Sequence, residues 1–174
     1  MKPQATFTLE YPDLNYAEDL FSYGKLPIFC EFIDAEPMID ISQARDFIQG
    51  LIDQNRRQEK DYYLVVSNRK CVGTMGLIYN RPASHKSALI GYGISPFAWG
   101  TNAFEQALGD LVSIARSKGL IRLEAITRND NKSSVNALLK NGFETEGILK
   151  SYYTAEDEDG IFRVDAHISS MILT

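Results

Sequence analysis

The side chains of this sequence that could do chemistry include a histidine and two cysteines, and a pair of glycines could admit the close approach of a ligand. Gly91 and Gly93 flank a tyrosine in an apolar run, where glycines mark a bulge or permit the close approach of another backbone. His167 is a candidate acid or base by residue type, although a lone histidine is more often half-buried than reactive. Cys30 and Cys71 each lie among apolar residues, so we expect neither a disulfide framework nor a metal site.

The composition is that of a chain able to bury a large apolar core. The sequence has 174 residues, 44% of them hydrophobic, which predicts one compact domain spanning residues 1–174. Its 18 Lys and Arg against 23 Asp and Glu give a net charge of −5, which argues against a nucleic-acid partner. No apolar run approaches the roughly 18 residues of a membrane span, so we expect no membrane association and a cytoplasmic location.

Two helices are predicted with clear apolar stripes. One follows the glycine pair and covers residues 102–118, with basic residues in its last turn and Gly119 as its stop. The other begins at Ser42, which is interpreted as its N-cap, and its far end is rich in Arg and Lys. The glycines themselves belong to a predicted strand over residues 88–94.

The remaining elements complete an alternation of strands and helices. Short helices are predicted over 16–22 and from Asn131 to Asn141. Alternating, β-branched or aromatic runs predict further strands, over 6–10, 62–66, 71–79, 121–126, 147–153 and 162–172. This order excludes an all-β sandwich and a helical bundle, and it predicts an α/β (α+β) fold, a mixed sheet with helices packed on its faces.

Several motifs occur in a recognisable order along the chain. The longest is residues 90–100 (IGYGISPFAWG), with Gly91, Tyr92, Pro96, Trp99 and Gly100 as its characteristic positions. The others are a glycine-containing strand, an "HRIEA"-like strand, an N-x-x-S turn and a "GFxxEG" segment, at residues 72–77, 121–125, 131–134 and 142–147. Together they resemble the GNAT superfamily of acetyl-CoA-dependent N-acetyltransferases, and within it the RimJ/RimL-like branch. The resemblance covers the chain from about Ser42 onward.

The resemblance implies a GNAT fold: a mixed, mostly antiparallel central sheet of about six to seven strands, helices on both faces and a splayed strand pair. It also implies transfer of an acetyl group from acetyl-CoA to a primary amine by direct attack in a ternary complex. The pantetheine arm would bond the backbone before the long helix, and the pyrophosphate would lie at that helix's N-terminus. The cofactor-binding residues so implied are Gly93, Ile94, Ser95, Trp99, Gly100, Thr101, Asn102, Ala103, Asn131 and Ser134.

The phosphate-binding loop departs from the family pattern at two positions. Asn102 replaces a glycine, and Phe104 occupies a site usually given to Gly or Ala. Asn102 with Glu105 three residues later is typical of a capping box, which would occupy first-turn amides and weaken diphosphate binding. Two alternatives remain: Asn102 adopts a positive φ in place of glycine, and Phe104 points into the core as part of the helix stripe.

The catalytic residues implied by the resemblance are Ser134, Tyr153 and Glu124. Ser134 would assist the departing sulfur, with Asn131 orienting it or bonding the pantetheine; the alternative is that both only cap a helix. Tyr153 falls where RimL-type relatives have a glutamate base, and its ordinary pKa of about 10 suits an acid or a water-holding group better. Glu124 is a base acting through water, or a structural partner of Arg122.

Partners and alternatives follow from the same reasoning. The expected acceptor is a small-molecule or peptide amine, and the expected assembly is a monomer or homodimer. The acidic run at residues 156–159 either attracts a cationic amine or forms a solvated hairpin tip. The alternative function is a degenerate GNAT domain that serves as a non-catalytic acyl-CoA-binding or regulatory module. Transfer of a longer acyl group is a third possibility.

Overall fold

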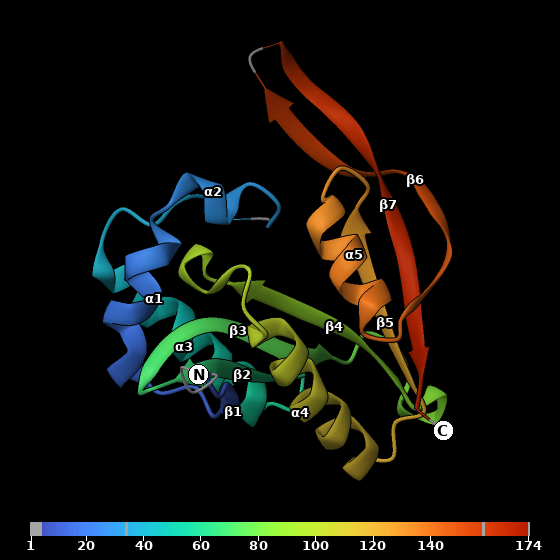
Figure 1. The fold of residues 1–174 in the computed structure, drawn as a ribbon, viewed down its shortest axis with the longest axis horizontal. Helices are drawn as coiled ribbons and strands as arrows, with labels where there is room; N and C mark the ends of the chain where they lie inside the picture. The colour runs from blue at the N-terminus through green and yellow to red at the C-terminus, as the bar shows by residue number, and fades with distance from the viewer. Residues whose placement is uncertain (1–4, 34, 158, 174) are drawn as a thin grey trace.

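The computed structural model describes residues 5–33, 35–157 and 159–173 and contains a mixed sheet flanked by helices (Figure 1). Within this described part the sheet has seven strands, in the spatial order β1-β2-β3-β4-β5-β7-β6. Their bounds are β1 Thr8–Glu10, β2 Lys60–Ser67, β3 Lys70–Ile78, β4 Ser87–Ile94, β5 Arg122–Arg128, β6 Glu144–Asp157 and β7 Gly160–Ile172. The β4–β5 pair is parallel, and the other neighbouring pairs in these ranges are antiparallel.

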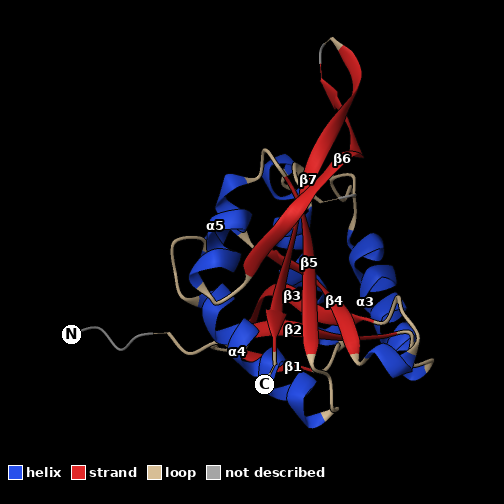
Figure 2. Cartoon of the chain, turned by 90° about the vertical axis from the view of Figure 1, so that its right-hand side faces the viewer, coloured by secondary structure: helices blue, strands red, loops and turns tan. Residues whose placement is uncertain are grey.

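The helices pack on both faces of the sheet. Figure 2 shows α4 and α5 on one side and α3 on the other. The helices are α1 Ala17–Gly24, α2 Pro27–Cys30, α3 Ile41–Arg56, α4 Ala103–Ser117 and α5 Lys132–Lys140, with short 3-10 turns at Leu14–Tyr16, Ala83–His85 and Pro96–Ala98. No helix in the described ranges is long and apolar enough to cross a membrane.

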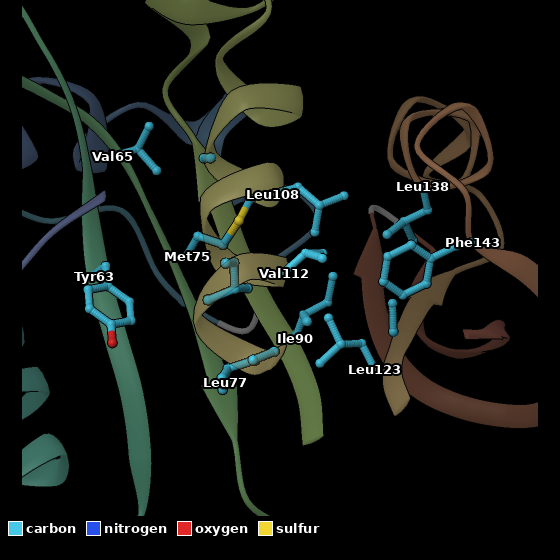
Figure 3. Packing of buried hydrophobic residues seen from close by; sticks show 14 of the residues in the cluster. Tyr63, Val65, Met75, Leu77, Ile90, Leu108, Val112, Leu123, Leu138 and Phe143 are labelled. Atoms are coloured by element: carbon cyan, nitrogen blue, oxygen red, sulfur yellow. The ribbon is translucent and has the colours of Figure 1, made fainter. Parts of the chain in front are cut away.

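The main core lies between the sheet and the pair α4 and α5. Leu108 and Val112 of α4 and Leu138 of α5 meet inward-facing strand residues such as Met75 and Leu123 (Figure 3). In β2, successive residues serve opposite faces: Tyr63 and Val65 join this core, whereas Leu64 and Val66 pack with Leu51 of α3. A strand buried on both faces explains the continuous apolar run in the sequence.

The predicted helices and strands are present, but the predicted N-cap of α3, Ser42, was wrong. The N-cap is Asp40, whose carboxylate accepts a hydrogen bond from the Ser42 N–H at 2.7 Å. Gln43 completes a capping box by accepting from the Ile39 N–H at 2.6 Å and from the Asp40 N–H. Ser42 therefore lies inside the first turn, because the return bond from Gln43 fixes Asp40 as the boundary.

The last two strands form a long hairpin that projects beyond the rest of the sheet (Figures 1 and 2). Their register shifts between Leu149 and Tyr153, so that residues 150–152 bulge out opposite Asp165. Asp165 accepts from the Ser151 N–H at 2.8 Å, and Arg163 donates to the Ser151 carbonyl. The acidic run lies at the hairpin tip, although its member Glu158 is outside the described residues.

Candidate active site

The centre of the sheet opens between β4 and β5. These strands pair only over Ser87–Leu89 and Arg122–Glu124, while β4 continues to Ile94 and β5 to Arg128 without pairing to each other. Figure 1 shows the two strands diverging beyond this junction. The splayed strand pair expected from the resemblance is therefore confirmed, and we call the space between the diverging segments the gap.

The β4 edge of the gap presents main-chain groups. The Gly93 carbonyl points toward β3, because a Cβ built on Gly73 would lie 2.5 Å from it. Alternate residues of a strand direct their N–H and C=O to opposite edges, so those of Tyr92 and Ile94 face the gap. The Ile94 carbonyl accepts a hydrogen bond from the indole Nε1 of Trp99 at 2.8 Å. Tyr92 and the Ile94 N–H thus supply the edge that an extended ligand can bond.

Ser95 lies at the end of this edge, with its polar groups engaged inside the protein. Its N–H donates to the Val72 carbonyl at 2.7 Å, and its hydroxyl accepts from the Phe97 N–H. Trp99, which follows, is half exposed rather than part of the core. The segment that joins β4 to α4 therefore begins with the turn Pro96–Ala98, which the hydrogen bonds of Ser95 hold in place.

The N-terminus of α4 shows that the expected capping box is wrong. Asn102 has a φ of −88° and makes no side-chain hydrogen bond to the first turn. Thr101 takes that role: its hydroxyl accepts from the Ala103 N–H at 3.2 Å and donates to the Ala98 carbonyl at 2.6 Å. The left-handed conformation belongs to Gly100, with a φ of +72°, so Asn102 does not replace a glycine in that sense. The later first-turn amides are left without a capping carboxamide, which suits an anion.

Phe104 turns away from these amides. Its ring packs against the ring of Tyr92, with centroids 4.8 Å apart, and against the edge of the main core. The expectation that Phe104 joins the helix stripe is confirmed. The ring that suggested a blocked loop therefore packs against Tyr92 and the core.

The two glycines of β4 serve packing on the other face of the sheet. The β3–β4 register runs through both glycines without a bulge. The prediction that they mark a bulge was therefore wrong. A Cβ at Gly91 would lie 2.0 Å from the Tyr62 hydroxyl, and one at Gly93 would lie 3.1 Å from the Phe29 ring. The missing side chains thus admit aromatic rings from β2 and α2 rather than a ligand in the gap.

A pair of hydroxyl groups spans the gap on its α5 side. Tyr92 Oη lies 2.5 Å from Ser134 Oγ, which belongs to the first turn of α5. Asn131 is the N-cap of that helix, and its Oδ1 accepts from the Ser134 N–H at 3.1 Å. Burial raises the pKa of Tyr92, and hydrogen bonding to the hydroxyls of Ser134 and Thr127 offsets part of that effect. Both hydroxyls therefore stay protonated at neutral pH.

Tyr153 reaches the opposite edge of the gap. Its hydroxyl donates to the Ile126 carbonyl at 3.1 Å. The Asn129 N–H bonds to Asp165 of β7, so by alternation the Ile126 carbonyl faces β4. The bulge at 150–152 sets the approach of this ring, which also packs edge-on against Tyr152.

Glu124 and His167 each have other hydrogen-bond partners. The Glu124 carboxylate is 5% exposed and accepts from Arg122 at 2.8 Å and from Arg81 at 3.1 Å, at the closed junction of β4 and β5. This geometry favours its structural interpretation. His167 Nε2 lies 2.7 Å from the Asn129 side-chain oxygen.

The structure thus brings Ser134, Asn131 and Tyr153 to the gap together with Ile94, and it places Glu124 at the closed end. The Tyr92 hydroxyl was missed by sequence reasoning. Strand alternation carried the signal, because Tyr92 shares a face with the buried Ala88 and Ile90 and so points toward the α4 and α5 side.

Comparisons with known proteins give matches over most of the chain. Residues 7–144 match the family described as an acetyltransferase (GNAT) domain. The N-acetyltransferase p20 of Bacillus licheniformis is 28% identical over 153 residues, 86% of this chain and 85% of its own. The N-acetyltransferase YoaA of Bacillus subtilis is 30% identical over 139 residues, 78% of each chain.

Solved structures show the same fold. RimL, a ribosomal L7/L12 alpha-N-protein acetyltransferase, superposes with a TM-score of 0.81 at 22% identity over 94% of this chain and 88% of its own. MccE, a Microcin C7 self-immunity acetyltransferase solved with acetyl-CoA and AMP, gives a TM-score of 0.80 at 26% identity over 95% and 92%.

Proposed function

The chain belongs to the GNAT acetyltransferase family, and on this premise we propose that it transfers the acetyl group of acetyl-CoA to a primary amine within a ternary complex. The observation that carries the proposal is the gap between β4 and β5, where an open main-chain edge and the Tyr92–Ser134 hydroxyl pair lie together. Acetyl-CoA supplies the activated acetyl group, and the protein positions it against the amine.

The residues around the gap suit the two ends of acetyl-CoA. An extended pantetheine arm fits the edge formed by Tyr92 and the Ile94 N–H, with Gly93 between them and Ser95 closing the edge. The diphosphate fits the N-terminus of α4, to which the segment of Trp99, Gly100, Thr101, Asn102 and Ala103 leads. The amides that it would use lie beyond Ala103, whose N–H is bonded to the Thr101 hydroxyl. The absence of a capping carboxamide on that first turn supports this assignment.

The chemistry requires a donor at the sulfur and a place for the amine's proton. We assign Ser134 as the donor, since its hydroxyl lies at the gap and Asn131 holds its turn. Tyr153, at the opposite edge, orients the amine or a water that takes the proton. Glu124 is assigned a structural role, because two arginines already bind its carboxylate.

The experiment is a panel of amines incubated with acetyl-CoA, read by release of free thiol. Because two similar structures are named for a ribosomal protein N-terminus and for Microcin C7 immunity, the panel contains peptide N-termini and small amines. Thiol release that depends on one amine class supports the proposal. Acetyl-CoA binding by calorimetry with no turnover of any amine would instead favour the non-catalytic binding module.

The Ser134→Ala variant tests the assigned donor. We expect kcat to fall at least tenfold, on the order of the contribution of one positioned proton donor, with the free energy of unfolding unchanged within about 0.5 kcal/mol. The control is Ser133→Ala, because Ser133 is the exposed neighbour on the same helix turn. Full activity of the Ser134 variant would remove this residue from the mechanism.

A further inference from the structure

The hydrogen bond between the Tyr92 and Ser134 hydroxyls suggests a role for Tyr92 that the proposed function does not include. This inference rests on the proposed function. Tyr92 extends from β4 and Ser134 from α5, so the 2.5 Å contact joins elements on opposite sides of the opening. We propose that Tyr92 is a positioning residue: its hydroxyl donates to Ser134 Oγ and thereby directs the Ser134 proton toward the sulfur of the thioester.

The direction of the hydrogen bond follows from the chemistry of the two hydroxyls. Each has one proton to give and two lone pairs to receive. A phenol is a much stronger acid than an aliphatic alcohol, and the alcohol oxygen is the better acceptor. Donation from Tyr92 to Ser134 is therefore favoured, and it leaves the Ser134 proton for a third group. If Ser134 donated to Tyr92 instead, the Ser134 proton would not be available to the sulfur.

The surroundings hold both partners in place. The Tyr92 ring is fixed by its contact with Phe104, and the Ser134 backbone is fixed by the Asn131 cap. A hydrogen bond received by a hydroxyl strengthens the one that it donates. Ser134 is therefore a better donor to a sulfur that gains negative charge than it is alone.

No proton needs to leave Tyr92. The amine's electron pair forms the new C–N bond, the C–S bond breaks with its pair going to sulfur, and the amine's proton passes to water. Ser134 stabilises the thiolate by a hydrogen bond while Tyr92 keeps its own proton, as its raised pKa requires.

The first test is a double-mutant cycle on thiol release. Tyr92→Phe keeps the ring and removes the hydroxyl, so we expect a roughly tenfold lower kcat with KM for acetyl-CoA unchanged within twofold. In a Ser134→Ala background, Tyr92→Phe should lower kcat less than twofold, because the hydroxyl that Tyr92 positions is absent. The control is Tyr62→Phe, a hydroxyl deletion on the opposite face of the sheet that should leave kcat unchanged.

The second test needs no amine. The thiol of bound CoA is titrated by thiolate absorbance, with desulfo-CoA as the blank. A hydrogen bond to the thiolate lowers its pKa, so the wild-type complex should titrate at lower pH than the Ser134→Ala complex, with Tyr92→Phe between them.

The two proposals fail in different ways. An active wild type whose Tyr92→Phe variant keeps full kcat, or loses activity equally in both backgrounds, overturns this inference alone. A wild type that turns over no amine but shows the ordered thiol titration overturns the proposed function and retains the Tyr92–Ser134 coupling. Identical titrations in the three complexes overturn the inference whatever the activity.

Discussion

Replacement of Gly91 by alanine tests whether this residue serves packing or ligand approach. An added Cβ would lie 2.0 Å from the Tyr62 hydroxyl oxygen, closer than the 3.0 Å that real Cβ atoms respect. The Tyr62 main chain is held in place, because its N–H and C=O are both bonded to the Asn55 side chain at 2.8 Å, so the ring itself must rotate to make room. The φ of Gly91 is not in the left-handed region, so the cost is one of space and not of backbone strain.

The expected magnitude follows from this geometry. Forcing a methyl group into a packed interior costs about 1–3 kcal/mol, from which about 0.4–1 kcal/mol is recovered because alanine lowers the entropy of the unfolded chain. We therefore expect Gly91→Ala to lower the free energy of unfolding by about 1–2 kcal/mol, or Tm by roughly 2–8 °C. In a Tyr62→Phe background the nearest atoms lie 3.2 Å away, and the cost should fall below about 1 kcal/mol.

The assay is urea unfolding of the four proteins of this cycle, together with calorimetric titration of acetyl-CoA. Packing predicts lost stability, partial rescue by Tyr62→Phe and unchanged acetyl-CoA affinity, since the Cβ points away from the gap. If Gly91→Ala were as stable as the wild type but bound acetyl-CoA more weakly, the glycine would serve the ligand and our reasoning would be refuted.

Two further predictions concern the site's support. Phe104→Ala should lower the free energy of unfolding by about 1–3 kcal/mol, because a half-buried ring and its contact with Tyr92 are lost, while calorimetry should give an unchanged acetyl-CoA affinity. Tighter acetyl-CoA binding at full stability would instead indicate that the ring crowds the phosphate loop. Arg122 and the Ser170 hydroxyl lower the pKa of Glu146 to about 2 from an ordinary 4.5. A lowered carboxyl pKa stabilises the fold above the ordinary value, and this contribution is lost as pH falls from about 4.5 to 2. Acid titration of the Glu146→Gln variant should therefore show less loss of stability over this window than the wild type, and equal loss would contradict the assignment.

The regular elements could be predicted because their signals are local. Spacings of three and four revealed α3 and α4, and alternation revealed the strands. Helix starts were harder, since several residues able to cap lie within three positions of each other. Asp40 and not Ser42 is the N-cap of α3, because the Asp40 N–H is bonded to Gln43. Asn102 holds the N-cap position of α4, but the side-chain hydrogen bond to the first turn comes from Thr101.

Only those parts of the site that belong to sequence motifs could be predicted. The resemblance located the gap and Ser134, but the purpose of Gly91 depends on Tyr62, a neighbour from another strand. The Tyr92–Ser134 contact likewise joins residues 42 positions apart. Contacts of this kind are set by how the elements pack, and no local pattern specifies them.

The insertion of β7 between β5 and β6 has a consequence for the nascent chain. β2, β3 and β4 are successive neighbours and can pair as they emerge from the ribosome. β5 and β6 both pair with β7, so their hydrogen-bond ladders are completed only after β7 has been synthesised. Synthesis therefore yields a half-built sheet first. The side of the gap that carries Ser134 and Tyr153 is completed only once the 13 residues of Gly160–Ile172 have been translated. The site is therefore assembled at the end of synthesis.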